Sequence, residues 1–151
     1  MGKETETAAV RPLTEADLSW LTALDGRCFP EAWSEAAWRS ELTNTLAHYL
    51  AFFEADVPFA YGGFWLVAGE AQIMRLAVAP ERRGKGCGLM LVGTLIHTAR
   101  SLGAAELTLE VREHNTAARR TYLRQGLTEC GRRPHYYEDT GEDAILMRRS
   151  L

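Results

Sequence analysis

A glycine-rich loop between an apolar strand and a long helical segment most constrains what this chain can fold into. The loop is Arg83-Gly84-Lys85-Gly86-Cys87-Gly88, and the segment before it, 71–78, is largely apolar, as in a central strand. From about Gly88 to Ser101 the spacing predicts a helix, whose apolar face contains Leu89, Val92, Leu95, Ile96 and Ala99. A strand, a loop and a helix in this order predict an α/β fold.

The composition of this loop favours phosphate binding. Glycine lets the backbone approach a ligand closely, and the first N–H groups of a helix have no partner within the helix. Arg83 and Lys85 add positive charge. The loop is not a P-loop, because Gly86 and not Ser or Thr follows Lys85, and Leu89 stands where the dinucleotide motif needs its third glycine. A turn that merely requires glycine is the alternative, but it leaves the flanking cations unexplained.

The rest of the chain alternates between strand and helix patterns, without a linker or an internal repeat. We expect one domain over residues 1–151, in which the polar residues 1–7 are flexible. Gly62-Gly63 is expected to weaken or bulge its strand. The patterns predict helices at 14–26, 34–42, 88–101 and 115–125, and strands at 8–12, 46–54, 59–68, 71–78, 106–112, 128–136 and 143–149.

Charge and hydropathy exclude several classes of protein. The formal net charge is −3 and the basic residues are dispersed, so we expect no nucleic-acid ligand. Arg132-Arg133 is a short basic spot, either a solvated strand end or a local substrate contact. The N-terminus lacks the apolar core of a signal peptide, and no apolar run approaches the length of a membrane span. We therefore expect a cytoplasmic protein without a membrane partner.

The cysteines and histidines predict neither a disulfide framework nor a metal site. The three cysteines are an odd number and show no C-x-x-C spacing, and the four histidines have no metal-ligand spacing. Reduced thiols are expected, and Cys87 is assigned no chemical role. The residues concerned are Cys28, Cys87, Cys130, His48, His97, His114 and His135.

The loop and several segments around it resemble the GNAT superfamily of acetyltransferases. Residues 83–88 match its Q/R-x-x-G-x-G/A loop and lie, as in that superfamily, between a strand and a long helix. Further segments resemble the RimI-type enzymes, which acetylate the N-terminal alanine of a ribosomal protein, and the resemblance extends over about residues 8–149. These segments are Phe29 with Trp33-Ser34, Leu109-Glu110-Val111-Arg112 with Asn115, Ala118 and Tyr122, and Tyr136-Tyr137 with Glu142-Asp143-Ala144 and Met147.

The resemblance implies a GNAT fold, with a mixed, mostly antiparallel sheet of about seven strands flanked by about four helices. It implies acetyl-CoA as cosubstrate, with its pyrophosphate on the glycine loop and its pantetheine arm along the strand backbone at 76–78. Asn115, first of all a helix N-cap, would also touch the cofactor. The residues expected to bind it are Leu76, Ala77, Val78, Arg83, Gly84, Lys85, Gly86, Cys87, Gly88, Leu89 and Asn115.

Glu110 and Tyr122 are the expected catalytic residues, and each has a simpler alternative. An amine attacks a thioester only as the free base, so a carboxylate that removes its proton, directly or through water, suits the reaction. By its strand position alone, Glu110 is a solvent-facing glutamate beside Thr108 and Arg112. By its helical spacing alone, Tyr122 is a core aromatic. The resemblance instead implies that Glu110 is the general base and Tyr122 the acid that protonates the CoA thiolate.

The acceptor is expected to be a protein N-terminus. An α-amine with a pKa near 7.8 is on the order of 10% neutral at pH 7, against roughly 0.04% for lysine. By resemblance the substrate is the N-terminal alanine of a small-subunit ribosomal protein, bound by Phe29, Trp33, Tyr136 and Tyr137, although these aromatics fit a core equally well. A small amine or a lysine as acceptor, and a non-catalytic acyl-CoA-binding module, are the alternatives. A monomer or weak oligomer is expected.

Overall fold

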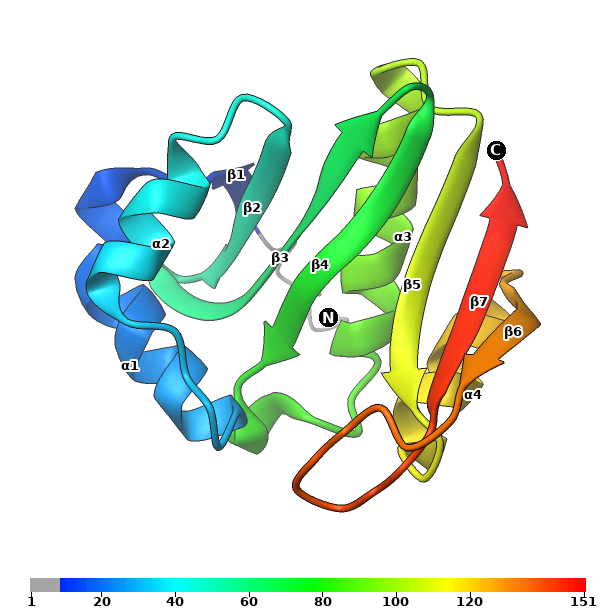
Figure 1. Ribbon diagram of the computed structural model, residues 1–151. Coiled ribbons are helices and arrows are strands. Elements are labelled where there is room, and N and C mark those ends of the chain that lie inside the picture. The colour runs from blue at the N-terminus through cyan, green and yellow to red at the C-terminus, as the bar shows by residue number, and fades with distance from the viewer. Residues whose placement is uncertain (1–8) are drawn as a thin grey trace, which may run out of the picture.

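In the part of the chain that the structure describes, seven strands form one mixed sheet with helices on both faces (Figure 1). The structure, a computed structural model, describes residues 9–151, so the flexibility expected of residues 1–7 lies outside the described residues. The strands are β1 (Ala9–Pro12), β2 (Ala47–Glu54), β3 (Val57–Val67), β4 (Glu70–Val78), β5 (Glu106–Arg112), β6 (Thr128–Arg133) and β7 (Ala144–Ser150). The helices are α1 (Leu18–Cys28), α2 (Glu35–Leu42), α3 (Cys87–Ser101) and α4 (Thr116–Arg124), with short 3-10 turns at Glu15–Asp17 and Pro80–Arg82.

The strand order is β1-β2-β3-β4-β5-β7-β6, and every neighbouring pair is antiparallel except β4 and β5. This confirms the predicted mixed, mostly antiparallel sheet of seven strands. Figure 1 shows α3 and α4 behind the sheet, and α1 and α2 on its other side. Within residues 9–151, no helix has both the length and the apolar character that crossing a membrane requires.

The parallel strands β4 and β5 pair at one end only, and this creates the space for a site. Their register joins Glu70–Gln72 to Glu106–Thr108 and goes no further. Just beyond, Met74 is an extra residue in β4, since Gly63 of β3 lies opposite Arg75 and Phe64 lies opposite Ile73. Such a bulge bends the strand that contains it. The carboxyl ends of β4 and β5 therefore diverge, as the green and yellow arrows in Figure 1 show.

The glycine pair in β3 is required by crowding on both faces of the sheet. A Cβ on Gly63 would lie 2.2 Å from Cδ1 of Tyr49, whose ring covers the glycine. A Cβ on Gly62, on the other face, would lie 3.1 Å from Leu95 and 3.2 Å from Leu91 of α3. The register shift follows directly after Gly63. The irregularity expected at these glycines is therefore present beside Gly63, but the extra residue is Met74 of β4 and not a residue of the glycine strand.

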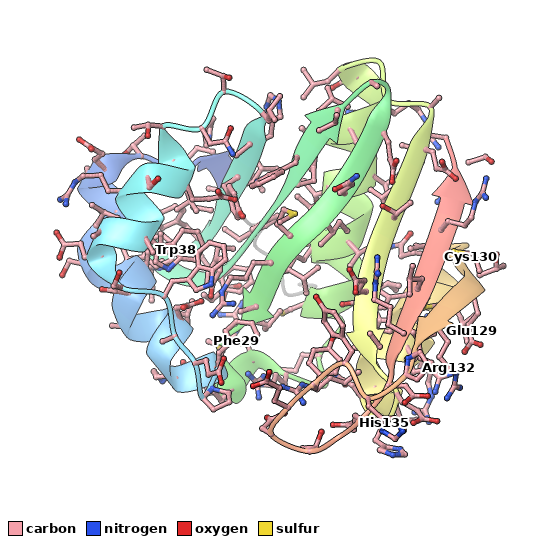
Figure 2. All side chains as sticks on the ribbon, in the orientation of Figure 1. Phe29, Trp38, Glu129, Cys130, Arg132 and His135 are labelled. Atoms are coloured by element: carbon pink, nitrogen blue, oxygen red, sulfur yellow. The ribbon has the colours of Figure 1, made fainter. Side chains whose placement is uncertain are left out.

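The core fills the space on both sides of the sheet. Trp38 of α2 is fully buried and meets the rings of Tyr49 and Tyr61 edge-on, with centroids 5.4 and 5.5 Å away (Figure 2). On the other face the buried side chains of α3 include Leu91 and Leu95. These two layers hold the central strands rigidly, so that the divergence of β4 and β5 is supported from both sides.

Ser34 and Asn115 cap α2 and α4 with their side chains, and Thr14 is the N-cap of the 3-10 turn that precedes α1. The side chain of Ser34 accepts a hydrogen bond from the amide of Ala37 at 3.0 Å, and Asn115 accepts one from Ala118 at 3.2 Å. At Thr14 a 3-10 turn precedes α1, and the carboxylate of Asp17 accepts the amide of Thr14 at 2.9 Å. Arg11 also pairs with this carboxylate, so charge and capping together stabilise the turn.

The strand predicted at 128–136 is three residues too long. β6 ends at Arg133, because Pro134 has no N–H to donate to a ladder and His135 adopts a positive φ of 50°. Tyr136 and Tyr137 therefore lie in the loop between β6 and β7. Their side chains are placed by that loop and do not alternate across the sheet.

Candidate active site

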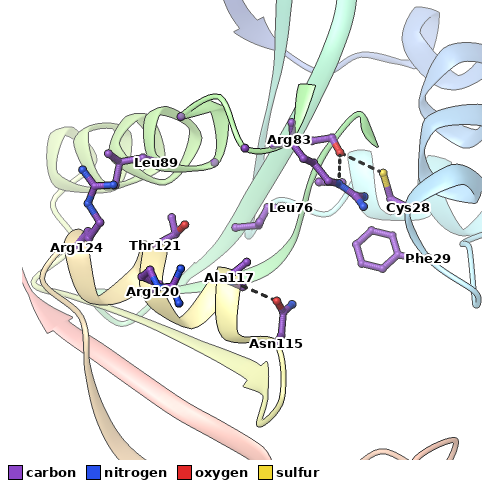
Figure 3. A pocket seen from close by; sticks show the side chains of 16 residues that line it. Cys28, Phe29, Leu76, Arg83, Leu89, Asn115, Ala117, Arg120, Thr121 and Arg124 are labelled. Atoms are coloured by element: carbon purple, nitrogen blue, oxygen red, sulfur yellow. Dashed lines mark hydrogen bonds between the residues drawn. The ribbon is translucent and has the colours of Figure 1, made fainter. Parts of the chain in front are cut away.

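A cavity of about 620 Å³ opens between the end of β4, the start of α3 and one face of α4 (Figure 3). Most of the residues predicted to bind a cofactor line it, whereas Lys85 and Cys87 do not. Phe29, predicted at the acceptor side, also lines this cavity, together with Cys28. The predicted residues that it brings together are Leu76, Ala77, Val78, Arg83, Gly84, Gly86, Gly88, Leu89 and Asn115.

The glycine loop gives the cavity a wall of backbone. Gly84 and Gly86 have φ angles of 76° and 82°, in the left-handed region that favours glycine. Gly86 is the N-cap of α3, so the first amides of this helix have no partner within it. A Cβ at either glycine would meet no protein atom within 4 Å. The local constraint is therefore backbone conformation beside an open space, as anion binding at a helix start requires.

Two side chains converge on the carbonyl oxygen of Val78 at the rim of the cavity. Nε of Arg83 donates to it at 3.1 Å, and Sγ of Cys28 donates at 3.6 Å (Figure 3). These contacts hold the guanidinium of Arg83 beside the end of β4. Burial raises the pKa of the Cys28 thiol, and Arg83 only partly opposes this. The thiol therefore stays protonated near neutral pH, and its position is suited to packing and not to nucleophilic attack.

A second cavity, of about 480 Å³, lies beside the earlier part of β4 and β5. Ile73 and Met74 line it, whereas Leu76 to Val78 line the first cavity, so one strand borders both at the point of divergence. Three predicted residues meet in this second cavity: Glu110, Tyr136 and Tyr137. The loop after β6 supplies the two tyrosines, whose rings meet edge-on at 5.1 Å.

Glu110 lies on the polar face of β5, opposite the buried Leu109 and Val111. Its side chain is 36% exposed, and its Oε2 accepts a hydrogen bond from Nε of Arg133 at 3.2 Å. Arg133 also lines the second cavity, whereas Arg132 pairs with Glu113 and Asp143 outside it. Glu110 is thus both partly solvated and directed at a cavity, so a proton that it accepts could leave to water.

Tyr122 lies buried on α4 and lines neither cavity. Burial, and to a lesser degree the nearby Tyr137, raises the pKa of Tyr122 to about 12. Burial and then Glu110 also raise the pKa of Tyr137, while Arg112 stacks 4.0 Å over its ring. Both phenols therefore remain protonated at neutral pH. Tyr137 lies near enough to both Glu110 and Tyr122 to interact electrostatically with each.

A buried ion pair holds the segment after α1 against β4. The carboxylate of Asp25 is fully buried and accepts two hydrogen bonds from Arg75, at 2.8 and 2.9 Å, one from Tyr61 and one from the amide of Trp33. Burial opposes ionisation, but these bonds outweigh it and lower the pKa of Asp25. The guanidinium of Arg75 lies between the rings of Phe29 and Trp33, 3.9 and 4.6 Å from their centroids.

Trp33 therefore lines neither the first nor the second cavity. Its ring packs against Trp38, with centroids 4.6 Å apart, and against Arg75. Of the two interpretations left open for this aromatic, its place in the structure favours the core. Phe29, four residues earlier, packs against the same arginine and lines the first cavity.

Comparison with known proteins identifies the family. The Acetyltransferase (GNAT) family model matches residues 18–127, which is well over half of the chain. This chain belongs to the GNAT family of acetyltransferases. The resemblance drawn from the glycine loop and the later segments is thereby confirmed, and the protein is an N-acetyltransferase.

The relatives of this GNAT enzyme include RimI-type proteins. A Bacillus subtilis protein named as a candidate ribosomal protein bS18-alanine N-acetyltransferase is 34% identical over 93% of both chains. The N-alpha-acetyltransferase RimI of Mycobacterium tuberculosis is 30% identical over 99% of this chain and 96% of its own. The crystal structure of the ribosomal-protein-S18-alanine N-acetyltransferase from Escherichia coli superposes with a TM-score of 0.88 at 28% identity, covering 96% of this chain and 94% of that one.

Several lining residues of this GNAT enzyme were missed by the sequence reasoning. On α4 they are Ala117, Arg120, Thr121 and Arg124, whose helical spacing places them on one face after Asn115. That spacing was a usable signal. Arg133, for which a local substrate contact was one of two interpretations, lines the second cavity. The other missed residues there come from separate strands, and no local pattern marks them: Glu70, Gln72, Ile73, Met74, Thr108, Leu109, Cys130, Leu146 and Met147.

Proposed function

We propose that this enzyme transfers the acetyl group of acetyl-CoA to the N-terminal α-amine of ribosomal protein S18. The observation that carries the proposal is the pair of cavities that adjoin the divergence of β4 and β5, one walled by the glycine loop and the other by Glu110. The RimI-type relatives support the choice of acceptor. We also propose that the chain acts as one domain, in the cytoplasm.

The residues of the first cavity fit acetyl-CoA. The cavity has the volume of a small-molecule site, and the charged side chains that line it are three arginines. The amides at the start of α3 and the guanidinium of Arg83 suit a diphosphate. The backbone of β4 beyond Gln72 has no β5 partner, so its outer edge is free to pair with the amide groups of an extended arm. When bound, acetyl-CoA supplies a thioester whose carbonyl carbon the amine attacks.

Glu110 takes the role of general base in this proposal. A protein α-amine is largely an ammonium ion at neutral pH and must lose a proton before it attacks. The carboxylate of Glu110 accepts that proton, directly or through a water molecule, in a cavity whose other walls include Tyr136 and Tyr137. Arg133 donates a hydrogen bond to Glu110 in this structure. Its positive charge therefore lies at the place that a substrate ammonium would approach.

Tyr122 takes the role of general acid. A phenol whose pKa is about 12 is fully protonated at neutral pH and can donate to the departing sulfur. Its burial on α4 keeps bulk water from competing for the same proton. Tyr136 and Tyr137 are proposed to contact the acceptor peptide, and Phe29 to close the end of the first cavity.

Mass spectrometry of three peptides tests the acceptor. The first begins with the N-terminal residues of S18, with alanine first, and contains one internal lysine; the second is the same peptide with its α-amine blocked; the third has the lysine replaced by arginine. We expect acetylation of the first and third peptides only, at the α-amine. Acetylation of the second would favour a lysine acceptor, and tight acetyl-CoA binding without modification of any peptide or small amine would favour a non-catalytic module.

A further inference from the structure

Arginines without a carboxylate partner gather in the first cavity. Within residues 9–151, ten of the fifteen arginines form ion pairs with Asp or Glu. Three of the other five, Arg83, Arg120 and Arg124, line this cavity, and none of the described acidic residues does. The cavity therefore presents three uncompensated positive charges, in a protein whose formal net charge is −3.

Two of these arginines form a pair on α4, away from the glycine loop. Arg120 and Arg124 are one helical turn apart, so their side chains project from the same face, and both are exposed. The neighbouring Arg119 instead pairs with Glu129. Figure 3 shows Arg124 beside Leu89 at one end of the cavity, and Arg83 beside Cys28 and Phe29 at the other. The positive charge is therefore distributed over two separate places.

We infer that Arg120 and Arg124 bind the 3′-phosphate on the ribose of CoA. The inference rests on the proposed function, since it assumes CoA in the first cavity. CoA carries a diphosphate and, separately, this phosphomonoester of about −2 charge. The proposed function assigns the diphosphate to the glycine loop and Arg83, and it assigns no ligand to the α4 pair. Guanidinium groups bind phosphate oxygens through two parallel N–H donors, so two of them one turn apart suit a terminal phosphate.

Isothermal titration calorimetry with CoA and with dephospho-CoA, which lacks only the 3′-phosphate, tests this inference. We expect the wild-type protein to bind CoA at least about tenfold more tightly. In the double variant Arg120→Gln/Arg124→Gln this preference disappears, while the affinity for dephospho-CoA is kept. Arg100→Gln is the matched control, because Arg100 on α3 also forms no ion pair with the acidic residues that the structure describes, but lies outside the cavity. The Arg100→Gln variant should keep the wild-type affinity for CoA and for dephospho-CoA.

The remaining outcomes separate this inference from the proposed function. Equal binding of both ligands by the wild-type protein overturns the inference and leaves CoA binding intact. Binding of neither ligand overturns both. If the double variant loses affinity for both ligands equally, the two arginines act on the diphosphate, and the inference is wrong. Arg120→Lys/Arg124→Lys, which keeps the charge but loses the parallel donors, should retain part of the preference for CoA. The melting temperature of each variant verifies that it is folded.

Discussion

The two cavities beside the divergence of β4 and β5 are built in different ways. The first is walled by the end of β4 and by the glycine loop, which are close together in the sequence, and by one face of α4. The second is assembled from the side chains of β4, β5, β6, β7 and the loop that contains Tyr136 and Tyr137. A wall made of local backbone depends on glycine conformation and helix geometry. A wall made of distant side chains depends on sheet register and on the buried contacts that hold each segment in place.

This difference predicts that substitutions in the two cavities have separable effects. Changes in the first should act on cofactor affinity, and changes in the second on turnover with the acceptor. Residues that hold the segments together should act mainly on stability. The following predictions are ordered from the largest expected effect to the smallest.

Glu110→Gln tests whether the second cavity carries the chemistry. The amide cannot accept the substrate proton, so kcat should fall about a thousandfold, while acetyl-CoA affinity is unchanged. Steady-state kinetics and calorimetry measure the two quantities. Glu106→Gln is a matched control: Glu106 lies on the same face of β5 and pairs with Arg148, but lines neither cavity. Equal losses in both variants would remove Glu110 from the mechanism.

Asp25→Asn tests how far the buried network holds the segments together. Removal of the charge leaves Arg75, whose side chain is only 13% exposed, without its partner, and should lower the free energy of unfolding by about 3 kcal/mol. Chemical denaturation measures this. Glu35→Gln, which breaks the exposed Arg39–Glu35 pair, should cost less than about 1 kcal/mol. A similar small loss at Asp25 would show that the network contributes little.

The same carboxylate gives stability a defined pH dependence. The folded state lowers the pKa of Asp25, so the unfolded state binds the proton more tightly. The contribution is therefore complete above the unfolded value of about 3.9 and is lost as the pH falls further, through the folded value. Asp17, whose pKa Arg11 lowers, acts in the same direction. Denaturation between about pH 2 and about pH 5 should show a smaller slope in Asp25→Asn, and an unchanged slope would contradict this.

Tyr122→Phe tests whether a residue outside both cavities takes part in the reaction. Loss of the hydroxyl should reduce kcat about a hundredfold, with little change in melting temperature or in acetyl-CoA affinity. Tyr49→Phe is the matched control, since it removes another buried hydroxyl, which donates to Glu41 at 2.7 Å. That variant should lose stability and keep its kcat. Unchanged turnover in Tyr122→Phe would restrict this residue to packing.

Gly86 and Gly88 are two residues apart and differ in backbone conformation, so they test the backbone wall of the first cavity. Gly86→Ala forces a side chain onto a φ of 82° and should destabilise the protein by about 1 kcal/mol. Gly88 is helical, and a Cβ there would meet only Thr121, at 4.0 Å. Gly88→Ala should therefore stabilise the protein by up to about 1 kcal/mol, because alanine favours the helical conformation more than glycine does. Denaturation curves with the same sign for both would contradict this account.

Prediction from sequence succeeded where short-range patterns decide the structure. The strand before the glycine loop, the helix after it and the caps at Ser34 and Asn115 all follow from neighbours within a few residues. The strand end at Arg133 was placed too late, because the prediction continued the strand past Pro134, which cannot donate to a ladder. The sequence also could not assign Trp33 to the core or to the acceptor site, since an aromatic residue four positions after Phe29 fits both equally well.

The sequence by itself determined the order of the elements, the phosphate-binding character of the loop and the family, because these depend on composition and spacing along the chain. Tertiary structure alone decided that Arg133 reaches Glu110 and that Arg75 contacts the rings of both Phe29 and Trp33. It also decided that Arg120 and Arg124 line a cavity to which no acidic residue of the described chain contributes. The physical reason is that pairing of charges and burial of rings depend on distances between segments far apart in sequence. Those distances are defined only once the sheet register and the bulge at Met74 are in place.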